Sequence, residues 1–147
     1  MAERTPVQVG LIRTYVKDLS FESPRAPHVF RKQSQPEIQV KVDVNQRNVD
    51  GPVFEVSVHL TIEARSGAEV DFMVELEHSG LFEVQGAEGK ELESILHVFC
   101  PTTIYPYARQ VVDAALVQGS FPPLLMAPIN FDALWRQRTG APQGGGN

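Results

Sequence analysis

The chain has 147 residues, of which 42% are hydrophobic, so its composition suits one domain with a buried core. Its net charge of −5 argues against a nucleic-acid-binding protein, because phosphate recognition needs a surface rich in Lys and Arg. No apolar run approaches the ~18 residues that span a bilayer, and the first six residues lack the pattern of a secretion signal. Together with a single cysteine, Cys100, this predicts a cytoplasmic protein.

The first half of the chain predicts strands. Polar and apolar residues alternate over residues 38–44, 54–62 and 70–78, and residues 7–16 also have strand character, with mixed residues on both sides. In residues 70–78, Asp71, Met73, Glu75 and Glu77 point away from the apolar side. Residues 23–36 are a proline-rich loop that Phe21 and Phe30 are expected to pin, and residues 45–52 are expected to be a polar connection.

The second half predicts helices. Apolar residues at helical spacing occur over residues 88–99 and again over 107–116, with Pro101 and Pro106 expected to interrupt the pattern and Gly119 to end it. Residues 121–128 are expected to be extended, and Asn130 to cap a short helix that runs to Arg138. Four strands followed by helices predict an α+β fold, with helices on one face of an antiparallel sheet. We expect a single domain over residues 7–138, a flexible tail over 1–6 and a disordered glycine-rich tail over 139–147.

Catalytic and metal-binding patterns are weak. His97 and Cys100 could share a helical face, but two ligands do not make a zinc site, and a buried structural cysteine is the more ordinary reading than a nucleophile. Residues 144–146 do not form a phosphate loop, because no lysine or serine follows the glycines. We therefore expect neither an enzyme nor a cofactor.

One stretch of the chain is strongly acidic. Residues 55–93 contain ten acidic residues and two basic ones. This pattern fits a solvated acidic face that keeps the protein in solution, and it also fits a surface that docks a basic partner. One sheet with a few helices is also expected to leave apolar surface uncovered, which either self-association or client binding could bury.

Three segments resemble the SecB family of protein-export chaperones. They are residues 16–24 with 26–30, residues 99–101 with 104–109, and residues 119–134. The resemblance extends from about Val9 to Arg138. It implies a homotetramer, built as a dimer of dimers, that holds unfolded precursor proteins without nucleotide. In the family, these precursors are passed to the SecA motor.

The resemblance also implies three groups of functional residues. The docking face for the zinc-bearing C-terminal tail of SecA maps onto Asp18, Glu22, Met73 and Glu75. An assembly-sensitive stretch maps onto Val74, Leu76 and His78, where His78 replaces a more usual amide. The groove for client segments is expected to include Val40, Val42, Val44, Val49, Leu125, Phe131, Leu134 and Trp135, although plain core packing would explain most of these.

Two other functions compete with the export role. A SecB-like chaperone could guard an antitoxin as one dedicated client, which would not need the acidic face. A thiol enzyme could use Cys100, and Cys100→Ala would then abolish its activity. We expect the protein to have no nucleic-acid partner and not to insert into membranes.

Overall fold

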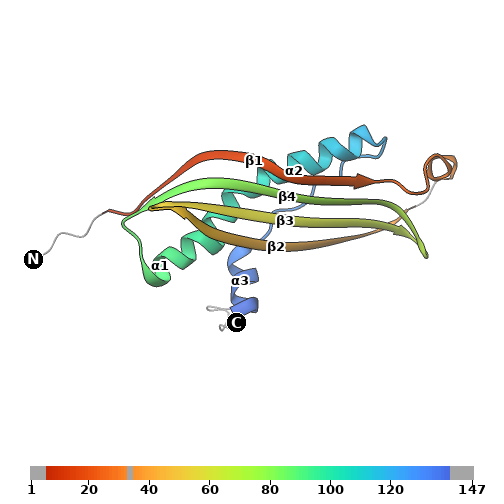
Figure 1. The fold of residues 1–147 in the computed structure, drawn as a ribbon. Coiled ribbons are helices and arrows are strands. Elements are labelled where there is room, and N and C mark those ends of the chain that lie inside the picture. The colour runs from red at the N-terminus through yellow and green to blue at the C-terminus, as the bar shows by residue number, and fades with distance from the viewer. Residues whose placement is uncertain (1–5, 33–34, 140–147) are drawn as a thin grey trace, which may run out of the picture.

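The structure is a computed structural model that describes residues 6–32 and 35–139. Four strands come first, and helices follow them (Figure 1). The strands are β1 (Gln8–Glu22), β2 (Glu37–Asp50), β3 (Val53–Ser66) and β4 (Glu69–Gln85), with the short 3₁₀ helix η1 (His28–Arg31) between β1 and β2. The helices are α1 (Gly89–Ser94), the π-helical segment η2 (Ile95–Phe99), α2 (Cys100–Gln118) and α3 (Phe131–Thr139).

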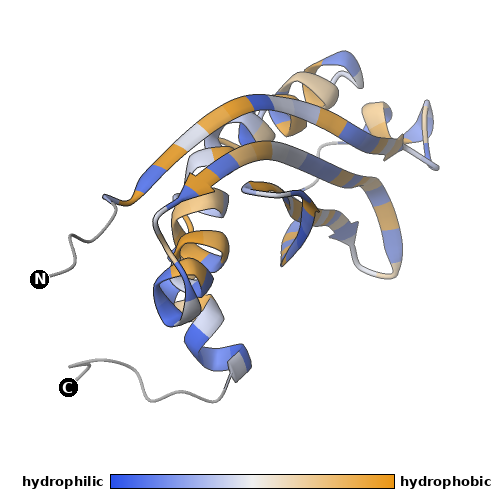
Figure 2. Ribbon diagram, turned by 60° about the vertical axis from the view of Figure 1, so that its left-hand side comes forward, coloured by the Kyte–Doolittle hydropathy of each residue, from blue (hydrophilic) through white to orange (hydrophobic). Residues whose placement is uncertain are grey.

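The sheet is antiparallel throughout, with the strand order β1-β4-β3-β2. Helix α2 crosses one face of the sheet (Figure 1), which we call the inner face. Hydropathy alternates along the strands (Figure 2), because successive residues point to opposite faces. The core lies between the inner face and α2, where it includes Val58, Leu60, Ile104, Val112 and Leu116. The predicted α+β fold, with helical packing on one face of a four-stranded antiparallel sheet, is confirmed.

All four strands extend beyond the ranges that their apolar patterns predict, and β1 continues to Glu22 where residue 16 was the predicted end. The prediction of a polar connection over residues 45–52 is wrong, because β2 continues to Asp50 and pairs with β3 along its length. The chain reverses instead at Gly51, whose φ of 54° is in the left-handed region that favours glycine. The Asn48 side chain donates to the carbonyls of Gly51 and Val53, at 2.9 and 3.1 Å, and so closes the hairpin. Strand β4 likewise extends to Gln85, beyond the expected end at His78.

The prolines do not divide the helical region as expected. Residues 89–118 run from α1 through η2 into α2 without a break, and Pro106 lies inside α2. Pro101 is the second residue of α2 and directly follows the π-helical segment η2. The amide of Cys100 bonds to Ile95 five residues earlier, which is the wider turn of a π-helix. Burial of Ile104, Tyr105 and Ala108 on both sides of Pro106 outweighs the one backbone bond that this proline removes.

The ends of α2 and α3 match the predicted signals. Helix α2 ends at Gln118, and Gly119 follows because a Cβ there would overlap the ring of Phe21. The Oδ1 of Asn130 accepts a hydrogen bond from the Ala133 amide at 3.0 Å, as expected of an N-cap. Helix α3 extends to Thr139, one residue into the predicted tail. The rest of the predicted tails, residues 1–5 and 140–147, lies outside the described residues, as do residues 33–34.

Candidate functional site

The residues expected to form an acidic docking surface lie together on the outer face, opposite α2. Glu22 pairs directly with Met73 across the β1–β4 ladder, Ser20 pairs with Glu75, and Asp18 pairs with Glu77. Directly opposed residues in such a ladder have Cβ atoms about 5 Å apart, so the side chains of Asp18, Glu22, Met73 and Glu75 form one patch. In the part of the chain that the structure describes, none of its three carboxylates pairs with a Lys or Arg. The patch therefore presents unneutralised negative charge beside one apolar side chain. We call it the acidic face.

A second charged cluster on the outer face ties the strands together. The carboxylate of Glu55 on β3 accepts hydrogen bonds from Tyr15 and from Lys17 on β1, the latter at 2.8 Å, and from Arg47 on β2 at 3.0 Å. Burial alone would raise the pKa of Glu55, but the hydrogen bonds from Lys17, Tyr15 and Arg47 lower it to about 2. Burial and the bond to Glu55 raise the pKa of Tyr15 to about 12. The alternation over residues 54–62 places Glu55 on the polar side of its strand, but Glu55 is only 6% exposed.

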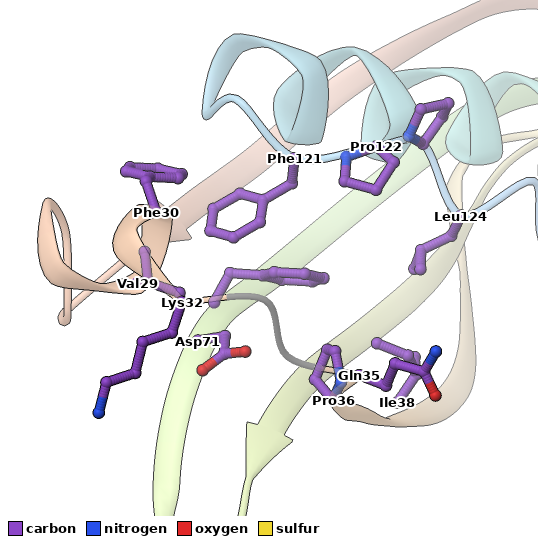
Figure 3. A pocket seen from close by; sticks show the side chains of 12 residues that line it. Val29, Phe30, Lys32, Gln35, Pro36, Ile38, Asp71, Phe121, Pro122 and Leu124 are labelled. Atoms are coloured by element: carbon purple, nitrogen blue, oxygen red, sulfur yellow. The ribbon is translucent and has the colours of Figure 1, made fainter.

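An apolar cavity of about 790 Å³ opens at the end of the sheet where β1 finishes. Phe121 lies at its centre (Figure 3), with its ring centroid 5.4 Å from that of Phe30 and 4.8 Å from that of Phe72. Its walls come from segments that are far apart in sequence. They are formed by Val29, Phe30, Lys32, Gln35, Pro36, Ile38, Asp71, Phe72, Phe121, Pro122, Pro123 and Leu124. The cavity thus offers aromatic and aliphatic surface to a ligand, with Lys32 and Asp71 among the charged groups that line it.

The loop that carries Phe30 is fixed to the sheet by a buried ion pair. Arg25 donates from Nη1 to Oδ1 of Asp71 at 2.9 Å, and the Asp71 side chain is 3% exposed. The other carboxylate oxygen of Asp71 accepts from the Ser66 hydroxyl at 2.8 Å, and Arg25 also reaches Glu69 at 2.7 Å. Asp71 was expected to face solvent. The structure instead uses it to hold the loop in place as a wall of the cavity.

A smaller cavity of about 270 Å³ lies between α3 and the sheet. Trp135 stacks on His97 there, with ring centroids 5.1 Å apart and an interplanar angle of 4°. Burial lowers the pKa of His97, and the charge of Glu93 opposes this effect. Gln46 contacts the same ring at 3.0 Å. Helix α3 is also anchored to the edge of β2, because Arg138 donates to the Val42 carbonyl at 2.7 Å and pairs with Asp43 at 2.6 Å.

The structure brings together only part of the predicted client groove. Val44, Phe131, Leu134 and Trp135 line the smaller cavity, and Val42 packs against the core nearby. Phe131 is 2% exposed and stacks edge-on against Tyr105, so it is a core residue at the base of this cavity and offers little surface of its own. Val40, Val49 and Leu125 are exposed and line neither cavity, and Val49 lies beside the β2–β3 turn at the far end of β2.

Sequence reasoning missed the larger cavity. Its aromatic residues belong to three segments. Only the expectation that Phe30 packs its loop against the domain indicated a contact between these segments. The apolar, proline-rich stretch 121–128 was a second signal. Neither signal identifies its partner, because the contacts between these segments are formed only by the tertiary fold.

The three residues expected to affect assembly lie inside the protomer. Val74, Leu76 and His78 are 0%, 3% and 4% exposed on the inner face, which α2 covers. They therefore do not form a protomer surface, and any influence on assembly is indirect, through the elements packed around them, such as α2 and β1. Neither ring nitrogen of His78 has a hydrogen-bond partner among the described residues. Burial lowers the pKa of His78, because the charged imidazolium would be desolvated there.

The described residues offer little to a catalytic mechanism. Cys100 is fully buried, and burial raises the pKa of its thiol to about 12, so it is not suited to nucleophilic attack. Within residues 6–32 and 35–139, no three His, Cys, Asp or Glu side chains are grouped as metal ligands. Nor is any described helix long and apolar enough to cross a membrane.

The described residues thus form one α+β sheet layer with an acidic outer face and two apolar cavities. The SecB family model, described as preprotein translocase subunit SecB, matches residues 2–141, and the chain belongs to this family. The protein-export protein SecB of Marinobacter nauticus is 42% identical over 130 residues, which cover 88% of this chain and 79% of the relative. The SecB of Pseudomonas fluorescens is 38% identical over 135 residues, covering 92% and 84% of the two chains.

A solved structure confirms the fold. The SecB-like chaperone Rv1957 of Mycobacterium tuberculosis, in complex with a ChAD peptide from the HigA1 antitoxin, superposes with a TM-score of 0.64. The match covers 82% of this chain and 90% of that one, at 16% sequence identity. The likeness therefore concerns the arrangement of the strands and helices.

Proposed function

We propose that this protein is an ATP-independent holdase of protein export, which binds unfolded precursor proteins in the cytoplasm and delivers them to the SecA motor. Membership of the SecB family supports this role, since its curated relatives are protein-export proteins. The observation that carries the proposal is the separation of two binding surfaces. An apolar cavity lined by Phe30, Phe72 and Phe121 suits exposed segments of non-native chains, and the acidic face lies on the opposite side of the sheet.

Client holding is tested by aggregation of an unfolded precursor without ATP. We expect a sub-stoichiometric amount of the assembled protein to suppress light scattering. A double substitution in the larger cavity, Phe30→Ser with Phe121→Ser, should reduce this protection, because it removes two of the aromatic side chains that would contact a client. A lack of protection by the unaltered protein would refute the holdase role.

Docking to SecA is tested separately on the acidic face. Glu75→Lys reverses one charge beside Met73 while leaving both cavities intact. We expect it to abolish binding to SecA and to leave client holding unchanged. Exposed charges are screened over about 8–10 Å at physiological ionic strength, so added salt should weaken SecA binding by the unaltered protein as well. Loss of client holding in Glu75→Lys would contradict the assignment of separate surfaces.

We further propose that the working form is a homotetramer, a dimer of dimers. Large apolar side chains remain exposed on β1 and on the side of α2 that faces away from the sheet. They include Leu11, Val16 and Leu19 on β1, and Tyr107 and Val117 on α2, with Phe99 just before α2. Association of copies would remove this surface from water. A molar mass by light scattering equal to that of one protomer would refute this part of the proposal.

An antitoxin chaperone is the second candidate, favoured by the fold of Rv1957. The acidic face argues for the export role, because a chaperone with one dedicated client would not need Asp18, Glu22 and Glu75. The two roles differ in one measurement. An export chaperone binds SecA in solution, and a dedicated antitoxin chaperone does not.

A further inference from the structure

One stripe of α2 fixes the extended segment that follows this helix. Tyr105, Arg109 and Asp113 are spaced four residues apart, so they share one side of the helix. The Tyr105 hydroxyl donates to the Ala127 carbonyl at 2.7 Å, and Arg109 donates to the Met126 carbonyl at 3.1 Å. The Oδ1 of Asp113 accepts from the amides of Leu124 and Leu125, at 3.0 and 3.4 Å. The segment has no regular secondary structure, so these side chains supply the partners for its backbone groups.

Leu125 is the unusual residue in this segment. Its φ of 54° lies in the left-handed region, which a residue with a bulky side chain rarely occupies. Its side chain is also 75% exposed, more than any other large apolar residue that the structure describes. An ordinary turn would place Gly or Asn at this position. The chain therefore keeps a leucine where both its backbone and its exposure are unfavourable in the free protomer.

We propose that Asp113 is a positioning residue for client binding. It holds Leu125 in the left-handed conformation so that this leucine is an apolar contact point for an extended segment of a non-native chain. This inference rests on the proposed holdase function and refines it. Strain of this kind persists where the surroundings impose it, and it commonly serves a binding function. Here Asp113 imposes it, because its carboxylate accepts from the strained residue and from the one before it.

The location of Leu125 favours a client over a second copy of the chain as its partner. Its neighbour Leu124 lines the larger apolar cavity together with Pro122 and Pro123 (Figure 3). A client segment that leaves this cavity along the segment would meet Leu125 next. The apolar residues proposed for assembly lie instead on β1 and in and just before α2. Leu125 thus extends the surface of the cavity.

The test uses two substitutions of Leu125 that differ only in backbone freedom. Leu125→Gly and Leu125→Ala both remove the apolar side chain, but only glycine relieves the left-handed strain. We measure the Kd for a fluorescently labelled, reduced and carboxymethylated protein by anisotropy without ATP, and the Tm of each variant. Both variants should bind at least fivefold more weakly, a loss seen for the minority of interface residues that contribute strongly to binding. Only Leu125→Gly should raise the Tm.

Asp113 is tested through its coupling to Leu125. Asp113→Leu removes the acceptor, and Asp113→Asn keeps an Oδ1 that can still accept. We expect Asp113→Leu to weaken client binding about as much as Leu125→Ala does. The double variant, Asp113→Leu with Leu125→Ala, should bind the client only slightly more weakly than either single variant. Asp113→Asn should bind the client as the unaltered protein does. A purely structural Asp113 would lower the Tm while leaving the Kd of Asp113→Leu within twofold of the unaltered protein, and this result would overturn the inference.

Two further outcomes are decisive. If the unaltered protein binds no unfolded client, the holdase function itself fails, and this inference fails with it. If it binds, but Leu125→Gly and Leu125→Ala bind the client as tightly as the unaltered protein does, only the inference fails. Light scattering is recorded for every variant, and a smaller assembly in both Leu125 variants would assign this leucine to the contact between copies and refute a role toward clients.

Discussion

The buried carboxylate of Glu55 offers a direct test of the outer-face cluster. Its pKa falls from an ordinary 4.5 to about 2, while its side chain is only 7% exposed. A difference of that size corresponds to roughly 3 kcal/mol of interaction between the carboxylate and its three donors, as an upper figure. Glu55→Gln removes the charge but keeps the shape of the side chain. We expect it to reduce the free energy of unfolding at pH 7 by about 2–3 kcal/mol.

The lowered pKa of Glu55 also determines how the stability of the protein changes with pH. The pKa of Glu55 is lower in the folded protein than in the unfolded chain, so the unfolded state takes up the proton first as the pH falls. The stabilisation is therefore complete above about pH 4.5 and is lost between that value and about pH 2. The unaltered protein should lose more stability over this interval than Glu55→Gln, which has no carboxylate to protonate at this position.

The assay is urea unfolding followed by far-UV circular dichroism, at a fixed protomer concentration, at pH 7 and pH 3. The concentration is held constant because association with other copies contributes to apparent stability. Glu83→Gln is the matched control, since Glu83 lies exposed on β4 of the same sheet. An equal difference between Glu55→Gln and the unaltered protein at both pH values would refute the reasoning.

Three further predictions concern the core and the two cavities. Burial lowers the pKa of His78 below its ordinary 6.5, so the unaltered protein should lose stability as the pH falls below that value. In the same unfolding assay, His78→Gln should lose less stability than the unaltered protein between pH 7 and pH 5. Trp135, the single tryptophan, should change its fluorescence when an unfolded client occupies the smaller cavity, and Trp135→Ala should raise the client Kd by about fivefold. Arg25→Gln should remove the ion pair between Arg25 and the buried Asp71, destabilise the protein by about 2 kcal/mol or more, and increase hydrogen exchange in residues 23–32 without changing SecA binding.

The sheet and the helices could be predicted because each has a local signal in the sequence. Alternation in residues 54–62 and 70–78 identifies the central strands, since β3 and β4 each bury one side against α2. Strand β2 lies at the sheet edge, so residues 45–50 need no apolar alternation to remain in the ladder. A prediction from hydrophobic periodicity alone therefore places the end of β2 too early.

The buried charges could not be predicted in the same way. Glu55 and Asp71 occupy positions that alternation assigns to the polar side, and the sequence does not reveal which cations will reach them. Their donors lie on other strands or in a distant loop, as Arg25 does for Asp71, 46 residues away. The larger cavity could not be predicted for the same reason, because its walls come from segments that are far apart in the sequence. Phe72 and Phe121 meet only because α2 returns the chain to the end of the sheet.

Alternation along β4 also explains how one strand serves two surfaces. Phe72 lines the larger cavity, and the next residue, Met73, belongs to the acidic face. A slip of one residue in the pairing of β4 would exchange these surfaces and place charged side chains in the core. The register is fixed at buried polar contacts, among them the 2.7 Å hydrogen bond between Ser57 and Ser79 in the middle of the β3–β4 ladder. Glu55 extends this control to β1 and β2, since its donors come from both edge strands. The outer-face cluster therefore keeps the acidic face and the larger cavity on opposite sides of the sheet.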